Sequence, residues 1–381
     1  MSEPAQLKDA EGRAAEAARP APSGTGDGLV LSNVSRVFPG GVVAVDDVNL
    51  RVENGEYVVL LGPSGCGKTT TLRMIGGHDE PTQGTIHMDG ELLNNVPPAK
   101  RPVTTVFQHF ALFPHRNVLQ NVAFGLKMRG VDKKAREKQA SDAIEMVGLG
   151  TMKQRKPREL SSGQQQRVAL ARVLVTRPKA ILLDEPFGDL DRLLQLRMRV
   201  ELRSLQRDLG ITFIHVTHNQ EEALSMSDRI VVMEGGRIQQ VGTPTDLSRH
   251  PKNVFVARFM GDNNTIRGPV ESAEGGVVTI AGAQARMRVN GTATVGAEAA
   301  ATVRASAVKV STDANVPDVN GARARLNFAE YLGDSVKLHL EVAGLPFLAK
   351  VDEHRYAELA KAEGSDVTVT WDAADAQLLE L

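Results

Sequence analysis

Cysteine is almost absent from this chain. Cys66 is the single cysteine among 381 residues, which excludes a disulfide within the chain and suits a reducing compartment. Neither sign of charge dominates, because 45 Lys and Arg face 46 Asp and Glu, so we predict no nucleic-acid partner. The apolar runs have the length of strands and fall short of the about 18 residues that cross a bilayer. For any membrane process, other subunits would have to supply the pore.

Composition divides the chain into three parts. Residues 1–27 are rich in Ala, Pro, Gly and charge, without the apolar run of a signal peptide, and predict a disordered tail. Residues 28–262 alternate strand and helix patterns, which predicts an α/β domain around a mainly parallel sheet. Within it, residues about 109–160 form a helical insertion. Short β-type runs between glycine turns in residues 263–381 predict a small all-β barrel domain.

A glycine-rich loop follows the apolar, β-branched run at residues 57–61. It matches the phosphate-binding pattern Gly-x-x-x-x-Gly-Lys-[Ser/Thr], and a helix pattern follows it, which is the strand–loop–helix context that the motif requires. We expect Lys68 to reach the β- and γ-phosphates of a nucleotide and Thr69 to hold Mg²⁺. An ordinary glycine turn is the alternative. The predicted nucleotide-binding residues here are Gly62, Pro63, Ser64, Gly65, Cys66, Gly67, Lys68, Thr69 and Thr70.

A second apolar run, residues 180–183, ends in two acids and is typical of a Walker B strand. Asp184 is expected to hold Mg²⁺, and Glu185 to polarise the water that attacks the γ-phosphate. Two acids that merely end a surface strand are the alternative. The phosphate loop favours the functional interpretation, because its metal site needs an acid at a neighbouring strand end.

The segment Leu160-Ser161-Ser162-Gly163-Gln164 resembles LSGGQ, the signature peptide of ABC-type ATPases. In that family the signature binds the γ-phosphate of ATP held by the other subunit. The resemblance implies that Ser161, Ser162, Gly163 and Gln164 contact a partner's ATP, and that the chain works as a homodimer or pairs with a relative. It also implies a P-loop ABC ATPase fold with a helical subdomain.

Other segments resemble the remaining motifs of this family. Gln108 matches the Q-loop glutamine, which contacts Mg²⁺ or water, and His218 matches the switch histidine at the γ-phosphate. Asp191 lies in the D-loop, and Phe38 falls where the family stacks an aromatic ring on adenine. Taken alone, each side chain could be structural. The resemblance implies catalysis by Glu185 with His218 and Lys68, which stabilise the developing charge.

Three positions depart from the common pattern. Ser162 replaces the first signature glycine, Asp189 stands in the loop after Walker B where alanine is usual, and Asn219 replaces the aspartate after the switch histidine. Because Asp189 adds negative charge near the phosphates, we expect a slow basal ATPase rather than a different function.

The resemblance covers roughly residues 28–381 and includes a β domain after the ATPase. The chain is similar to the ATP-binding subunits of ABC importers of the maltose/polyamine/iron group, whose C-terminal domain is a transport-associated OB barrel. Residues 106–115, 209–214 and 220–224 are most similar to the spermidine/putrescine branch. A sugar, ferric iron, an opine or a phosphonate stays an alternative solute. A soluble non-transport ABC ATPase, a nucleotide sensor and an exporter subunit are the alternatives of other classes.

An importer subunit implies further partners. These are two membrane-spanning permease subunits and, indirectly, an extracytoplasmic solute-binding protein, with this chain peripheral at the cytoplasmic face of the inner membrane. The resemblance assigns Phe110, Leu112 and Phe113, just after the Q-loop, to the groove that receives a permease helix. Burial in a core is the alternative for these side chains.

Overall fold

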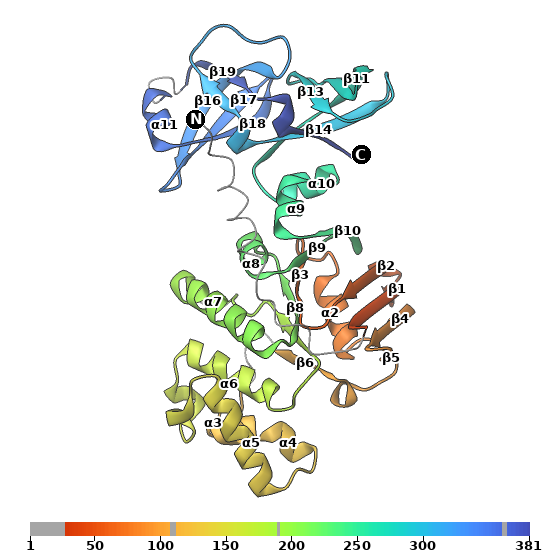
Figure 1. Ribbon diagram of the computed structural model, residues 1–381, viewed down its shortest axis with the longest axis vertical. Helices are drawn as coiled ribbons and strands as arrows, with labels where there is room; N and C mark the ends of the chain where they lie inside the picture. The colour runs from red at the N-terminus through yellow and green to blue at the C-terminus, as the bar shows by residue number, and fades with distance from the viewer. Residues whose placement is uncertain (1–26, 107–111, 189–190, 360–363) are drawn as a thin grey trace, which may run out of the picture. The chain divides into compact units, whose positions relative to one another are not determined.

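The computed structural model describes residues 27–106, 112–188, 191–359 and 364–381 of the chain (Figure 1). Contacts between residues divide the chain into two compact units, Met1–Ile238 and Gln239–Leu381. Among the described residues, no helix is both long and apolar enough to cross a membrane. From the sequence we predict the boundary between the α/β domain and the β domain to lie between residues 262 and 263, and this boundary stays a prediction.

A six-stranded sheet of order β10-β9-β3-β8-β7-β6 forms the centre of the ATPase-like part of the chain. Its apolar strands pair in parallel, as the sequence predicts, and β3 is buried along its whole length. Parallel strands end at the same edge, so the loops that follow β3, β7 and β8 meet there. The strands are β3 (Tyr57–Leu61), β6 (Val103–Val106), β7 (Ala180–Asp184), β8 (Thr212–Thr217), β9 (Arg229–Glu234) and β10 (Arg237–Gly242).

A second sheet in the same unit is antiparallel, with order β2-β1-β4-β5. One apolar cluster joins this sheet, the central sheet and helix α2, and includes Leu31, Leu60 and Ile75, each at most 2% exposed. Burying a side chain of this size stabilises the fold by about 1.5–3 kcal/mol. The strands are β1 (Leu29–Phe38), β2 (Val42–Val52), β4 (Gln83–Met88) and β5 (Glu91–Leu92).

Helices connect the strands of the first unit (Figure 1). The sequence predicts a helical insertion at about 109–160, and α3, α4 and α5 lie within it. The longest helix, α7, begins after an Asp191 cap, whose carboxylate accepts a hydrogen bond from Leu194 N–H, and ends at Gly210 in the left-handed region. The helices are α2 (Lys68–Gly76), α3 (Val118–Val122), α4 (Phe124–Met128), α5 (Lys133–Met146), α6 (Ser162–Leu174), α7 (Arg192–Leu209) and α8 (Gln220–Met226).

The second unit is mostly β-structure, as predicted, but it holds a sheet in addition to the barrel. A closed barrel of order β11-β12-β13-β20-β14 is accompanied by a five-stranded sheet of order β15-β19-β16-β17-β18. Phe347 and Trp371 lie in the shared apolar core with ring centroids 5.7 Å apart. The elements are α9 (Pro244–Arg249), α10 (Val254–Phe259), β11 (Asn263–Glu274), β12 (Val277–Ala281), β13 (Arg286–Asn290), β14 (Glu298–Arg304), β15 (Lys309–Ser311), β16 (Gly321–Tyr331), β17 (Val336–Val342), β18 (Leu345–Val351), α11 (Glu353–Leu359), β19 (Asp366–Thr370) and β20 (Ala376–Leu379).

Candidate functional site

The glycine loop lies between β3 and α2, in the context that the motif requires. Two of its glycines are needed for space. A Cβ on Gly62 would lie 2.3 Å from the backbone oxygen of Met233, and a Cβ on Gly67 would lie 2.4 Å from that of Ala44. Gly67 also caps α2 with a φ of 99°, in the left-handed region. The loop is therefore pressed against neighbouring backbone on one side, while Ser64 and Gly65 remain exposed on the other.

Lys68 turns back into this loop. Its Nζ donates to the carbonyl oxygens of Gly62 at 2.7 Å and Pro63 at 2.8 Å, and the residue is only 5% exposed. The third proton of the ammonium group is directed at the sole cysteine, Cys66, which is buried beside it with Sγ 3.7 Å from Nζ. Because a thiol sulfur is a weak acceptor, an anion can take this third donor in its place.

The two predicted metal ligands meet across the site. The Thr69 hydroxyl donates to Asp184 Oδ1 at 3.2 Å, which joins the start of α2 to the end of β7. Burial raises the pKa of the Asp184 carboxyl, and the hydrogen bond from Thr69 opposes that rise. One hydroxyl and one carboxylate fit Mg²⁺, which takes few protein ligands and fills its other positions with phosphate and water. Among the described residues, no group of three His, Cys, Asp or Glu side chains forms a metal cage.

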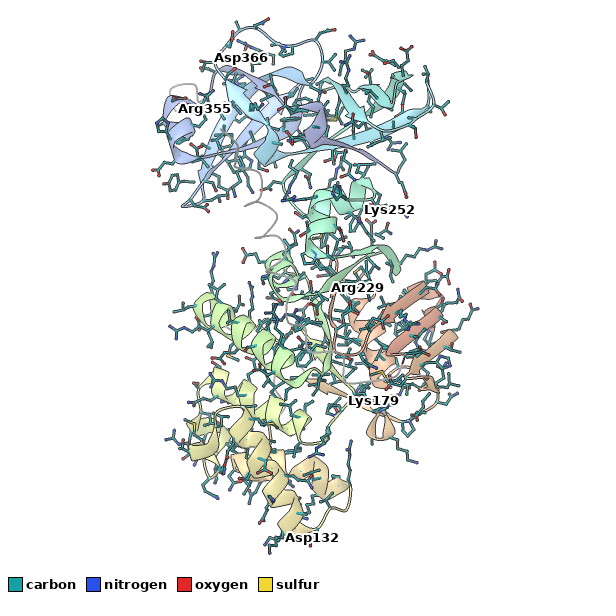
Figure 2. All side chains as sticks on the ribbon, in the orientation of Figure 1. Asp132, Lys179, Arg229, Lys252, Arg355 and Asp366 are labelled. Carbon is teal, nitrogen blue, oxygen red and sulfur yellow. The ribbon has the colours of Figure 1, made fainter. Side chains whose placement is uncertain are left out.

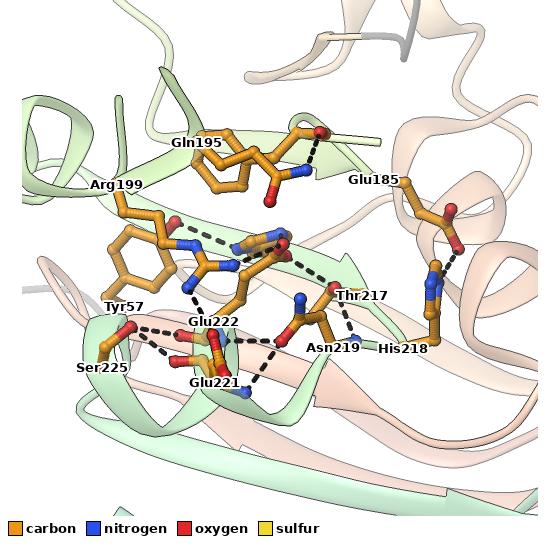
Figure 3. Close-up of polar contacts among 12 residues, drawn as sticks. Tyr57, Glu185, Gln195, Arg199, Thr217, His218, Asn219, Glu221, Glu222 and Ser225 are labelled. Atoms are coloured by element: carbon orange, nitrogen blue, oxygen red, sulfur yellow. Dashed lines mark hydrogen bonds and ion pairs between the residues drawn. The ribbon is translucent and has the colours of Figure 1, made fainter. Parts of the chain in front are cut away.

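Glu185 and His218 form a second pair at the same edge of the sheet (Figure 3). His218 Nδ1 lies 3.1 Å from Glu185 Oε1, and their side chains are 62% and 32% exposed. Glu185 has a φ of 45°, and its N–H donates to the oxygen of Val216 at 3.0 Å. This left-handed conformation costs a non-glycine residue about 1–2 kcal/mol and turns the carboxylate out of the direction of β7.

Phe38 ends β1, as a half-buried ring. The guanidinium of Arg36 lies over that ring at 4.7 Å from its centroid, and Arg36 itself donates to the oxygen of Glu80 at 2.7 Å. The aromatic residue is thus held at the strand end by a cation–π contact. Its contact with adenine stays a prediction.

The signature segment begins helix α6. The helix starts at Ser162, because Ser161 and Gln164 close a capping box. The Ser161 hydroxyl accepts from Gln164 N–H at 3.3 Å, and the Gln164 side-chain oxygen accepts from Ser161 N–H at 3.0 Å. Ser162 and Gly163 therefore lie in the first turn of the helix.

The two signature positions after Ser161 differ in environment. Ser162 is exposed, so its side chain meets no neighbouring core. Gly163 is buried, and a Cβ there would lie 3.3 Å from Leu194 and 3.4 Å from Met198 of α7. The chain thus keeps glycine where α6 approaches α7 and replaces it where the side chain has space.

The remaining predicted residues are only partly described. Gln108, Phe110 and Asp189 lie outside the described residues. Leu112 and Phe113 are half-buried rather than free. Phe113 packs edge-on against Phe124 at 4.6 Å and receives the guanidinium of Arg116 at 4.9 Å and of Arg172 at 4.8 Å. This ring is fixed by its own subdomain, which leaves its contact with a permease a prediction.

Sequence reasoning assigned no role to a group of buried polar residues behind His218. Arg199, Thr217 and Glu222 are 7%, 2% and 5% exposed, and His215 is fully buried. One sequence signal was present: a histidine in the middle of the apolar run of β8 has to find a polar partner inside the protein. Figure 3 shows that these residues converge from β8, α7 and α8.

Comparison with protein families gives two matches. The model of the ABC transporter family matches residues 45–188, and that of the TOBE domain matches residues 301–379.

Curated relatives match nearly the whole chain. The spermidine/putrescine import ATP-binding protein PotA of Rubrobacter xylanophilus is 45% identical over 357 residues, which cover 92% of this chain and 93% of the relative. The protein of the same name from Lawsonia intracellularis is 43% identical and covers 91% of this chain and 96% of its own length.

Solved structures match more than half of the chain. The bacterial ABC transporter cassette MJ0796, in a dimeric structure, is 33% identical with a TM-score of 0.50 and covers 57% of this chain and 98% of that one. The cbiO1 protein of Clostridium perfringens, part of the ABC transporter complex cbiONQ, is 29% identical with a TM-score of 0.55, and the match covers 58% of this chain and 90% of that one.

Proposed function

The chain belongs to the ATP-binding proteins of ABC transporters and is an ATPase, and on that premise we propose that it energises polyamine import. Its solute is then spermidine or putrescine, as the names of the relatives at 45% and 43% identity suggest. The observation that carries the proposal is the meeting of the glycine loop, the Thr69–Asp184 pair and the Glu185–His218 pair at one edge of the central sheet.

Each group at this edge has a task in hydrolysis. The glycine loop binds the phosphates through backbone N–H groups at the start of α2. Lys68 directs its third proton to the β- and γ-phosphates. Thr69 and Asp184 would hold Mg²⁺, together with Gln108, and the bound ion supplies positive charge against the phosphate oxygens.

Glu185 acts on the attacking water. It accepts a hydrogen bond from that water and takes up its proton as the water oxygen attacks the γ-phosphorus. The bond from the γ-phosphorus to the oxygen that bridges to the β-phosphate breaks, and ADP and inorganic phosphate depart. His218 orients the carboxylate through Nδ1. A phosphate oxygen only accepts, so Nε2 of His218 has to donate where it contacts the γ-phosphate. Turnover therefore needs His218 to be held in position.

A second copy of the chain completes the site in this proposal. The signature residues of one chain contact the ATP bound by the glycine loop of the other, and the dimeric structure of the related cassette supports this arrangement. Ser161 and Gln164 bond to each other's N–H groups in the capping box, which leaves the N–H groups of Ser162 and Gly163 in the first turn of α6 for the phosphate. Phe38 stacks on adenine, and Asp191 lies near the junction of the two sites.

Transport requires partners that this chain lacks. We place it at the cytoplasmic face of the inner membrane, bound to two permease subunits. In this proposal the permease subunits contact the region of Phe110, Leu112 and Phe113. They receive the solute from an extracytoplasmic binding protein. Closure of the ATP-bound dimer would then drive the permease.

Uptake by cells tests the choice of solute. A strain that lacks the gene is supplied with the wild type or with Glu185→Gln at equal protein level, and uptake of labelled spermidine and putrescine is compared with that of maltose, ferric iron, an opine and a phosphonate. The proposal predicts that the wild type restores polyamine uptake only, and that Glu185→Gln restores none. If the wild type restored uptake of another solute alone, the proposal would be wrong and the chain would serve an importer of that solute.

A further inference from the structure

His218 has little packing of its own. Its side chain is 62% exposed and contacts Glu185 through Nδ1 at 3.1 Å. An exposed ring with so few contacts is oriented mainly by its backbone, so whatever fixes residues 217–219 also fixes the imidazole. The groups that do this lie beneath the surface.

The Thr217 hydroxyl forms two hydrogen bonds that fix the backbone on both sides of His218. It donates to Glu222 Oε2 at 2.7 Å and accepts from the N–H of Asn219 at 3.0 Å (Figure 3). Thr217 is 2% exposed, so both bonds are shielded from water, where losing a partner is costly. One buried oxygen thus ties the residue before His218 to the residue after it.

Glu222 anchors this hydroxyl to two helices. It belongs to α8, whose first turn is capped by the Asn219 oxygen, which accepts from the N–H of Glu221 at 2.9 Å and of Glu222 at 3.3 Å. Asparagine caps a helix as well as aspartate does, so Asn219 keeps this contact despite its departure from the family pattern. Across the site, Arg199 of α7 donates to Glu222 Oε1 at 3.3 Å.

Glu222 is a buried carboxylate, and the groups around it show which cation pairs with it. Burial raises the pKa of its carboxyl, which the bond from Thr217 and the cation of Arg199 oppose. His215 lies with Nε2 3.7 Å from Glu222 Oε2, but burial, aided by Arg199, lowers the pKa of its imidazole to about 3 and leaves it neutral. Tyr57 OH lies 3.2 Å from the other nitrogen of this ring. Arg199 is therefore the cation that pairs with Glu222.

We propose that Thr217 and Glu222 are positioning residues for His218, and that the Arg199–Glu222 ion pair joins this position to helix α7. Since α7 begins directly after Asp191, the same contact links the switch histidine to the helix that follows the D-loop. The inference rests on the proposed role of His218 in ATP hydrolysis. The alternative is that this network stabilises the fold without affecting chemistry.

The test is to remove the hydroxyl while keeping its shape. Thr217→Val loses both hydrogen bonds at nearly constant volume, Thr217→Ser keeps the hydroxyl, and Ser225→Ala removes an exposed hydroxyl of the same helix α8 as the matched control. Steady-state Mg²⁺-ATP hydrolysis gives kcat and KM for each variant, and calorimetry gives the melting temperature. His218→Ala is measured in parallel.

If Thr217 positions His218, its loss changes kcat much more than KM. Thr217→Val lowers kcat by up to about 100-fold, because a misplaced catalytic group loses that much, while KM stays within about threefold. Thr217→Ser recovers kcat, and Ser225→Ala does not change it. The inference is overturned if Thr217→Val keeps kcat within about threefold at a lowered melting temperature, if kcat and KM worsen alike, or if serine does not rescue. Should His218→Ala itself keep the wild-type kcat, the proposed role of His218 fails first and the inference with it.

Discussion

The buried His215 predicts that acid destabilises the first unit of the chain. Burial lowers the pKa of its imidazole to about 3, from the ordinary value of 6.5 for histidine. The folded state therefore stays unprotonated at this site while the unfolded state takes up a proton as the pH falls below about 6.5. Stability that is fully present above that pH is lost as the pH decreases, down to the folded pKa.

The magnitude follows from these two pKa values. Between about pH 7 and pH 5 the unfolded state gains about 0.7 proton at this site, which lowers the free energy of unfolding by about 1.9 kcal/mol. For a unit of this size, that corresponds to a decrease of about 4–7 °C in melting temperature. Glu222 acts in the opposite direction, because its pKa is raised and the folded state binds that proton more readily as the pH falls.

The assay compares the wild type with His215→Gln in calorimetric scans at several values of pH. The transition of the first unit is identified as the one that ATP raises. The expected result is a smaller loss of stability between about pH 7 and pH 5 in the variant, by about 1–2 kcal/mol, whatever its absolute melting temperature. Equal pH slopes in the two proteins would refute the claim that His215 is buried and neutral.

Three further predictions follow from the site. Gly67→Ala lowers the free energy of unfolding by at least about 2 kcal/mol, because the new Cβ would lie 2.4 Å from a backbone oxygen. The Cβ of Gly65→Ala meets no atom within 4 Å, so this variant loses only the about 1–2 kcal/mol that a left-handed backbone costs alanine. Equal melting temperatures for the two variants would contradict this account. Gly163→Ala gains up to about 1 kcal/mol of helix propensity, but its Cβ would lie 3.3 and 3.4 Å from the side-chain ends of Leu194 and Met198, so we expect the two effects nearly to cancel. Ser162→Gly changes the free energy of unfolding by less than about 0.5 kcal/mol. Thermal unfolding that shows the full gain of about 1 kcal/mol for Gly163→Ala would contradict the close approach of α6 to α7. Mg²⁺ affinity decreases on acidification at a higher pH than an ordinary aspartate would give, because burial raises the pKa of Asp184 and protons compete with the metal for its oxygens. Titration calorimetry with ATP present measures this affinity. Asp184→Asn is expected to remove the pH dependence along with most of the affinity.

The sequence predicted the central elements of the ATPase unit well, because their signals are local. Residues 57–61 form β3 and residues 180–184 form β7, since runs of apolar residues in a parallel sheet are buried on both faces. The loops after these strands had to meet, because parallel strands end at one edge. The pairing of Thr69 with Asp184 and of Glu185 with His218 follows from that topology.

Features that depend on contacts between distant segments were not predictable in this way. The two β-structures of the second unit differ in strand pairing, which periodicity does not specify. The ion pair of Arg199 and Glu222 joins residues 23 positions apart on helices whose packing has to be known first.

The central claim is that Glu185 promotes hydrolysis in a site completed by a second copy of the chain. It is tested most directly by measuring Mg²⁺-ATP turnover of the purified wild type and Glu185→Gln, with the oligomeric state of both followed by light scattering. The account predicts that the wild type turns over, and that Glu185→Gln binds ATP, does not turn over and accumulates as an ATP-dependent dimer. A Glu185→Gln protein that hydrolyses ATP at the wild-type rate, or one that binds ATP and stays a monomer, would contradict it.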